Sequence, residues 1–202
     1  MMRRLFAAMY DTVSKGSEEG GMREERRKLV ASARGATIEI GAGTGLNLQH
    51  YPDAVSRLVL VEPDRHMRVR LGKRIDALYP AAEISDASAE SLPFADATFD
   101  TAVVTLTLCS VRDQQVALHE IARVLKPGGR LLFLEHVRSD DPTVARWQDR
   151  ISPLYNLVGC NPNRETLAAI EGSPLTIESV TKGEIPKAPK LERPMIVGSA
   201  HL

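Results

Sequence analysis

The stretch ATIEIGAGTGLNLQHYP, residues 36–52, places Gly41, Gly43 and Gly45 directly after a short apolar run. Apart from Glu39, residues 37–40 are β-branched, which is typical of a buried strand. The three glycines then predict a tight turn whose backbone N–H groups can approach a ligand closely. A plain strand-to-helix turn would use the same glycines, so other parts of the sequence must distinguish a ligand site from a simple turn.

Apolar runs alternate with amphipathic segments along the chain, which is the pattern of a mostly parallel sheet wrapped by helices. Besides residues 37–40, strands are predicted at residues 57–62, 83–85, 99–105, 130–135, 175–181 and 194–200. The last two strands have no room for a crossover helix between them, so we expect them to be antiparallel. The sequence therefore predicts an α/β fold.

The clearest predicted helix begins after Asp113, a capping residue, and stops before the Pro-Gly-Gly at residues 127–129. Its apolar face is expected to comprise Val116, Ile121, Val124 and Leu125. Another helix is predicted over residues 65–78. Residues 6–33 are expected to be helical with a break at KGSEEGG, residues 15–21, because glycine and serine favour a hinge there.

Composition limits the classes of protein to consider. With 202 residues, 43% of them hydrophobic and 26% charged, the chain suits one globular domain. The 26 basic and 26 acidic residues give a net charge of zero, so no global field attracts nucleic acid or an anionic bilayer. Cys109 and Cys160 lack the close spacing of zinc ligands, so we expect no metal site, and a reducing cytoplasmic location.

Glu62 ends the second predicted strand, RLVLVE, and can accept hydrogen bonds from a ribose diol. The turn GAGTG differs from the G-x-G-x-x-G spacing of dinucleotide sites, since Leu46 stands where the last glycine would be. Glu39 before the turn would repel a pyrophosphate and suit a cation. A sulfonium that carries an amino group is such a ligand.

Four segments together resemble the class I S-adenosylmethionine-dependent methyltransferases: EIGAGTG, VEPD, SAESLPFADATFD and ARVLKPGGRLLFLEHV. The resemblance implies a Rossmann-like seven-stranded sheet, mostly parallel, with helices on both faces and an antiparallel last strand. It also implies S-adenosylmethionine as cofactor and S-adenosylhomocysteine as product. The partner is then a small-molecule methyl acceptor rather than a nucleic acid.

Three further segments, TLTLCSVRDQ, FLEHV and GCNPNRET, resemble the group that contains the animal microsomal thiol S-methyltransferases. This implies an alkyl thiol acceptor. Alternatives are N- or O-methylation of a quinone, lipid head group or amine, and a non-catalytic cofactor-binding regulatory module. The sequence lacks the long apolar anchor of the animal members, so we expect no stable membrane insertion; weak peripheral attachment through Arg3 and Arg4 stays open.

By motif, the resemblance implies that the cofactor meets a set of residues contributed by several loops. The set comprises Glu39, Gly41, Ala42, Gly43 and Gly45 on the methionine side, Glu62 and Pro63 near the ribose and adenosine, Ser88, Ala89 and Glu90 near adenine, and Thr105 and Leu106 under the methionine. Leu5, Phe6, Met9 and Tyr10 share one side of the front helix, which suits a lid that places Tyr10 against the cofactor.

His136 follows the fifth predicted strand and is the candidate base or thiol-orienting residue. The alternative is a structural histidine bonded to Glu135 or to a backbone carbonyl. The expected organisation is a single methyltransferase domain over residues 1–202. Within it we expect a helical lid at 1–34, a cofactor-binding core at 35–138, and an acceptor-side segment with the final strand pair at 139–202.

Overall fold

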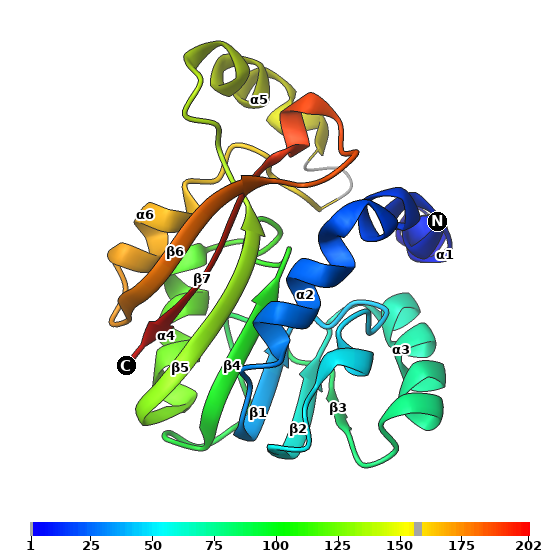
Figure 1. The fold of residues 1–202 in the computed structure, drawn as a ribbon, viewed down its shortest axis with the longest axis vertical. Coiled ribbons are helices and arrows are strands. Elements are labelled where there is room, and N and C mark those ends of the chain that lie inside the picture. Colours follow the sequence, from blue (N-terminus) through cyan, green and yellow to red (C-terminus); the bar gives the residue numbers. More distant parts are fainter. Residues whose placement is uncertain (1, 156–158) are drawn as a thin grey trace.

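The computed structural model describes residues 2–155 and 159–202, which form a seven-stranded sheet with helices on both faces (Figure 1). The sheet order is β3-β2-β1-β4-β5-β7-β6. The first five strands pair in parallel, and β7 runs antiparallel to both β5 and β6. The strands are β1 (Gly35–Ile40), β2 (Val55–Val61), β3 (Glu83–Ser85), β4 (Phe99–Thr105), β5 (Leu125–His136), β6 (Thr176–Glu184) and β7 (Pro194–His201). The predicted Rossmann-like α/β fold is confirmed.

Each face of the sheet buries its own apolar cluster beneath a different set of helices (Figure 1). The α2, α3 and η2 helices cover one face, and α4 and α6 cover the other. The helices are α1 (Met2–Ser17), η1 (Glu18–Met22), α2 (Arg23–Val30), η2 (Leu48–His50), α3 (Arg65–Leu78), α4 (Gln114–Val124), α5 (Pro142–Tyr155), α6 (Thr166–Glu171) and η4 (Lys190–Glu192).

The predicted signals at helix ends are present. Asp113 Oδ1 accepts hydrogen bonds from the N–H groups of Gln115 at 2.9 Å and Val116 at 3.2 Å, so it caps α4. The break in the front helix lies at η1, where Gly21 has a φ of 139°, a conformation that glycine adopts without strain.

Two of the four residues predicted for the apolar face of α4 differ: Leu125 is buried but begins β5, and Val116 is exposed. The Val116 side chain is 45% exposed, whereas Ile121 and Val124 are buried as expected. The buried stripe of α4 runs through Ala117, Leu118, Ile121 and Ala122, and Val116 lies one residue out of phase with it. Two of the buried positions are alanines, whose small side chains mark an apolar face less clearly than a valine does.

The strand order reverses between β1 and β4, so the chain leaves these neighbouring strands in opposite directions. In open α/β sheets, ligands bind in the crevice outside the carboxyl ends of the strands at such a reversal. The glycine turn follows β1 there, and the turn at residues 106–110 follows β4. The α1 and α5 helices both lie beyond this edge of the sheet (Figure 1). Across residues 2–155 and 159–202, none of the helices combines the length and apolar character needed to cross a membrane.

Candidate functional site

The glycine turn after β1 has an open side at Gly43. Gly41, Gly43 and Gly45 have φ values of 70°, 58° and 86°, a region that side chains disfavour. A Cβ on Gly41 would come within 2.3 Å of Thr107 Oγ1, and one on Gly45 within 2.8 Å of Leu48 Cδ1. A Cβ on Gly43 would meet only the Gly41 carbonyl oxygen, at 3.9 Å. Gly43 therefore borders a space that a ligand can fill.

Glu62 lies beside the same turn, just beyond β2, and is 7% exposed. Its Oε2 accepts a hydrogen bond from the Gly43 N–H at 2.9 Å, and its Oε1 accepts one from the Asp64 N–H at 2.8 Å. A carboxylate has about four acceptor positions, so two remain for the hydroxyls of a ribose. Burial raises the pKa of Glu62 above its ordinary value. Pro63, next in the chain, is exposed. These positions fit the predicted nucleoside site.

Glu39, on β1, is 1% exposed and both of its oxygens have partners. Asn47 Nδ2 donates to Oε1 at 2.9 Å, and the Tyr51 hydroxyl donates to Oε2 at 2.7 Å. Burial raises the pKa of Glu39 to about 7. In this structure Glu39 positions the segment around η2, and its contact with the cofactor stays a prediction. Ala42, between the first two glycines, is 5% exposed.

Arg26 is a buried charge that the sequence analysis missed. It lies on α2 and is 3% exposed. Its Nε donates to Glu18 Oε1 at 2.9 Å, and its Nη1 donates to Thr105 Oγ1 at 2.9 Å and to Asn47 Oδ1 at 3.2 Å. Thr105, predicted to lie under the methionine, thus has its hydroxyl engaged by α2. The Arg26 network joins the front helices to the end of β4.

Asp11 connects α1 to the glycine turn. Thr44 Oγ1 donates to Asp11 Oδ1 at 2.6 Å, and Arg74 Nη2 donates to Asp11 Oδ2 at 2.9 Å. Arg74 Nη1 also donates to the Thr44 carbonyl at 2.9 Å. The neighbouring Tyr10 has its pKa raised by burial, and the charges that act on it include those of Arg26 and Glu18. The side chains of Leu5 and Phe6, predicted to share this face, lie outside the described residues.

The predicted adenine-side residues follow β3. Ala89 is 6% exposed, Ser88 forms an isolated bridge with Ser91, and Glu90 Oε1 accepts a hydrogen bond from the Arg112 N–H at 2.8 Å. The Asp86 side chain is 81% exposed and faces Arg68. The structure brings these residues to the expected edge of the sheet, and their contact with adenine stays a prediction.

The turn after β4 is held by a buried carboxylate from β5. Glu135 Oε1 accepts hydrogen bonds from the N–H groups of Thr107 at 2.8 Å and Leu108 at 3.0 Å. Thr107 Oγ1 donates to the Ile40 carbonyl at 3.1 Å, which ties this turn to β1. Leu106 has a φ of 55°, a conformation uncommon for a leucine and frequent at functional sites. Burial raises the pKa of Glu135 to about 7.

His136 ends β5 and lies in a cluster with the two cysteines. It is 4% exposed, and Cys160 Sγ lies 3.8 Å from its Nε2 and 3.9 Å from Cys109 Sγ. Burial opposes a charged imidazole, yet Cys109, Glu135 and Glu192 act together to raise the pKa of His136. The side chain of Cys160 and burial raise the pKa of Cys109 well above its ordinary value. Their spacing along the chain gave no indication of this cluster.

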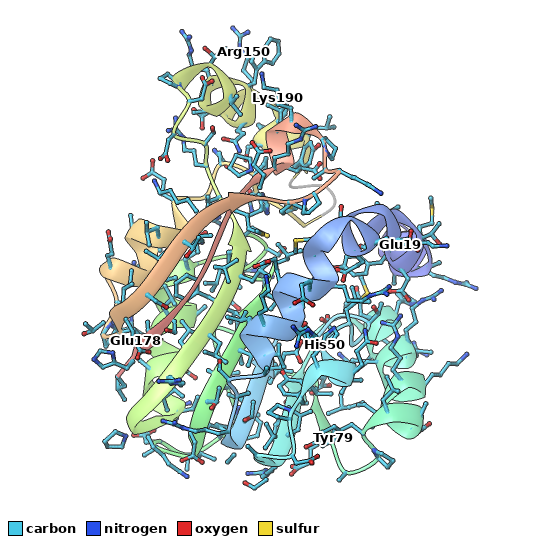
Figure 2. The ribbon with its side chains drawn as sticks, viewed as in Figure 1. Glu19, His50, Tyr79, Arg150, Glu178 and Lys190 are labelled. Carbon is cyan, nitrogen blue, oxygen red and sulfur yellow. The ribbon has the colours of Figure 1, made fainter. Side chains whose placement is uncertain are left out.

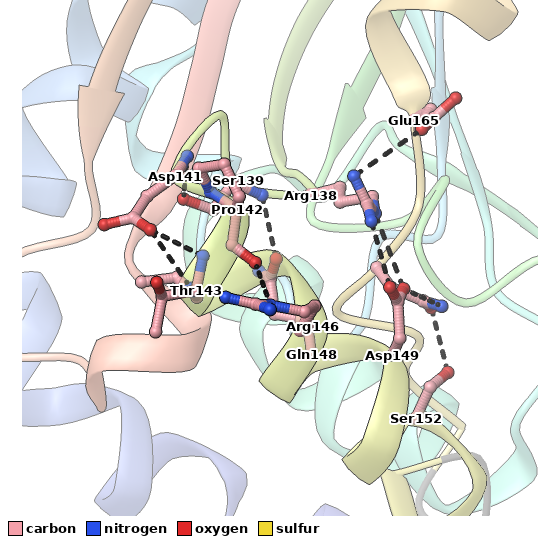
Figure 3. A network of polar contacts seen from close by, with 12 residues as sticks. Arg138, Ser139, Asp141, Pro142, Thr143, Arg146, Gln148, Asp149, Ser152 and Glu165 are labelled. Carbon is pink, nitrogen blue, oxygen red and sulfur yellow. Dashed lines mark hydrogen bonds and ion pairs between the residues drawn. The ribbon is translucent and has the colours of Figure 1, made fainter.

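The segment after β5 is fixed by polar contacts (Figure 3). Arg138 Nη2 pairs with Asp149 Oδ2 at 2.9 Å, and Gln148 Oε1 accepts a hydrogen bond from the Ser139 N–H at 2.8 Å. These contacts hold α5 beyond the carboxyl edge of the sheet. Arg150, on α5, and Lys190, in η4, lie beyond this edge of the sheet (Figure 2).

Known proteins resemble this chain over most of its length. The family model described as a methyltransferase domain matches residues 38–133. The human thiol S-methyltransferase TMT1A is 33% identical over 175 residues, which cover 84% of this chain and 71% of that protein. The ubiquinone/menaquinone biosynthesis C-methyltransferase UbiE of Syntrophotalea carbinolica is 37% identical over 122 residues, which cover 59% of this chain and 51% of that protein.

A solved structure shares the fold. The geranyl diphosphate C-methyltransferase of Streptomyces coelicolor A3(2), in a complex that contains S-adenosyl-L-homocysteine, superposes with a TM-score of 0.68 at 14% identity. The match covers 91% of this chain and 76% of that one.

Proposed function

Since this chain belongs to the S-adenosylmethionine-dependent methyltransferases, we propose that its methyl acceptor is the sulfur of a small thiol. The observation that carries the proposal is the 33% identity to a human thiol S-methyltransferase over 84% of this chain. The cluster of Cys109, His136 and Cys160 lies at the carboxyl ends of β4 and β5, where an imidazole can stabilise an acceptor thiolate.

S-adenosylmethionine is the methyl donor, and it supplies an electrophilic methyl group on a positively charged sulfur. The transfer is an in-line displacement, so the residues of the chain mainly have to position two sulfur atoms and exclude water. In our proposal the open side of Gly43 and the carboxylate of Glu62 hold the donor, together with the predicted contacts of Thr105 and Leu106. His136 lies on the acceptor side and favours the thiolate form of the acceptor.

We further propose that residues 1–34 form a lid over this site. The contact of Asp11 with Thr44 and Arg74 supports this, because it attaches α1 to the glycine turn itself. Residues 35–138 then form the cofactor-binding core, and residues 139–202 supply the acceptor side and the final strand pair.

The proposal is tested by an acceptor panel. The purified protein is incubated with S-adenosylmethionine and an alkyl thiol, an amine, a phenol or a quinol, and S-adenosylhomocysteine is quantified. We expect turnover with the thiol alone. Turnover with the other acceptors and none with the thiol would contradict the proposal.

A second candidate acceptor is a quinol. The 37% identity to UbiE over 122 residues favours it. The same panel separates the two candidates, because methylation of a quinol ring gives a carbon-methylated product and methylation of a thiol gives a thioether.

A further inference from the structure

Three groups that bind soft metal ions meet near the carboxyl ends of β4 and β5, although 51 residues separate the two cysteines in sequence. Cys109 lies in the turn after β4, His136 at the end of β5, and Cys160 in the loop after α5. Their ligand atoms all lie within 4.8 Å of one another. Cys109 and His136 are 2% and 4% exposed, whereas Cys160 is half-buried.

Two of the three distances between these ligand atoms are close to those of a tetrahedral site, and the third is within 4.8 Å. Zinc–sulfur bonds are about 2.3 Å long and zinc–nitrogen bonds about 2.0 Å, so neighbouring ligand atoms of a tetrahedral site lie roughly 3.5–3.8 Å apart. Here Cys160 Sγ is 3.9 Å from Cys109 Sγ and 3.8 Å from His136 Nε2. A disulfide would need the two sulfurs at about 2.05 Å, far closer than they lie, and both cysteines are free thiols. We propose that Cys109, His136 and Cys160 hold a Zn²⁺ ion whose fourth position receives the acceptor sulfur.

The backbone around the cluster is already fixed. Asn161 donates from its N–H and from its Nδ2 to the Cys109 carbonyl oxygen, both at 3.0 Å, so the loop that carries Cys160 is joined to the turn that carries Cys109. Arg164 Nη2 donates to the Val111 carbonyl at 2.9 Å, which attaches the segment after Cys160 to the chain after β4 at a second point. Ligands held in place by their own supporting bonds are a property of built metal sites.

The charges of the proposed site also balance. Two thiolates neutralise a Zn²⁺ ion, so the loaded cluster carries no net charge in its buried position, whereas two buried thiolates without a cation would be costly. A thiolate acceptor at the fourth position makes the site anionic, which complements the positive sulfonium of the donor. Catalytic zinc sites commonly use three protein ligands and keep one position open, and two cysteines with one histidine are one such set.

The role of the ion in methyl transfer rests on the proposed function, the methylation of a small thiol, and adds how the thiol is activated. An acceptor thiol that binds the fourth position releases its proton to solvent. A lone pair on its sulfur then forms the new bond to the methyl carbon, while the bond between that carbon and the sulfonium sulfur breaks and its electron pair stays on S-adenosylhomocysteine. No group is oxidised or reduced. The neutral thioether product is a weaker ligand than a thiolate and leaves.

Metal binding itself is tested without any acceptor. The full chain is reduced, treated with a chelator, and titrated with Co²⁺, whose absorption reports thiolate ligands and tetrahedral geometry, and Zn²⁺ is then added to displace it. We expect one equivalent of Co²⁺ with thiolate-to-metal absorption. Cys109→Ser, His136→Ala and Cys160→Ser should each weaken binding by at least about tenfold. His119→Ala, on the exposed face of α4, is the matched control and should bind as the parent does.

Calorimetric binding of S-adenosylhomocysteine shows which variants keep the fold. If Cys109→Ser does not fold, Cys160→Ser, at the half-buried position, tests metal binding in its place. Absent thiolate absorption, or unchanged affinity in the folded variants, would overturn the metal site. The acceptor panel is then repeated with zinc-loaded and metal-free protein. Thiol turnover that is equal in both overturns the role of the ion in transfer and leaves the proposed function standing. Metal binding without turnover of any thiol keeps the site, and overturns the proposed function and the role of the ion in transfer.

Discussion

The carboxylate of Glu62 accepts a hydrogen bond from the Gly43 N–H at 2.9 Å, which joins the end of β2 to the turn after β1. The acidic strand end and the glycine turn are therefore joined directly, and we propose that they are two parts of one nucleoside site. Removing either part should weaken cofactor binding, but for different physical reasons.

Glu62→Ala removes the oxygens that we propose as acceptors for the ribose hydroxyls. Loss of hydrogen bonds to a charged group costs about 1.5–3 kcal/mol, so we expect the dissociation constant of S-adenosylhomocysteine to rise roughly 10- to 150-fold. Isothermal titration calorimetry measures it. Glu178→Ala, on the exposed β6, is the control and should bind normally. An unchanged constant for Glu62→Ala would refute the ribose assignment.

Gly43→Ala places a methyl group in the space that the cofactor should fill. A side chain at positive φ costs about 1–2 kcal/mol of folding free energy. Gly128→Ala has the same backbone cost, since its φ is 75° and nothing lies within 4 Å of its added Cβ. We expect both variants to lose similar stability in urea unfolding, and only Gly43→Ala to lose cofactor affinity. Equal affinity in the two would show that the space beside Gly43 is not part of the site.

Asp11→Ala should loosen α1 from the glycine turn. Asp11 and Arg74 are about one-third exposed, so we expect a loss of only about 1 kcal/mol, seen as roughly a fivefold rise in KM for S-adenosylmethionine. Glu24→Ala, which breaks the exposed pair with Arg27 on α2, controls for the loss of a surface ion pair. Identical KM values in the two variants would argue against a lid anchored at Asp11.

Glu39→Gln should change how stability depends on pH. The pKa of Glu39 rises from 4.5 to about 7 on folding, so the folded state holds this proton more tightly and stability falls as pH rises from about 4.5 to 7. Glutamine stays neutral and can still accept from Asn47, while the Tyr51 hydroxyl can rotate to accept in turn.

Between pH 4.5 and 7, the free energy of unfolding of the Glu39→Gln variant should therefore fall by about 3 kcal/mol less than that of the parent. Urea unfolding at a series of pH values measures the difference. Glu135, whose pKa is also raised to about 7, keeps some pH dependence in the variant. Glu171→Gln, at the exposed end of α6, is the control and should show the same pH dependence of stability as the parent. A Glu39→Gln curve parallel to that of the parent would contradict the raised pKa of Glu39.

His136→Gln should slow methyl transfer to a thiol while leaving cofactor binding intact. We expect the turnover number to fall at least about tenfold, because the variant loses the imidazole that, in our proposal, favours the thiolate. The dissociation constant of S-adenosylhomocysteine should not change. His119→Gln is the matched control. Unchanged turnover at every pH would remove His136 from the mechanism.

The alternation of apolar and amphipathic segments was enough to predict the sheet. Residues 83–85 and 99–105 are strands with the predicted bounds, and α3 spans the predicted residues 65–78. These elements were predictable because their patterns are local. The strand β5 begins at Leu125, five residues before the prediction, because Pro127 and the two glycines after it lie in the strand rather than between helix and strand.

Contacts between distant segments were not predictable in the same way. Arg26 sits in the sequence REERRKLV, which suggests a solvated helix. It lies four residues after Met22 and four before Val30, both buried, so the helical period does place it on the inner face. No comparable signal joined Cys109 to Cys160, since their proximity depends on how α5 returns the chain to the sheet.

The position of β7 has a consequence for synthesis of the chain. β7 is the last of the seven strands to leave the ribosome, yet it lies between β5 and β6 in the finished sheet. Until it emerges, the nascent chain displays an unpaired edge on β5 that can associate with another chain. During the interval between translation of residues 136 and 201, this edge is thus open to aggregation and to capture by chaperones.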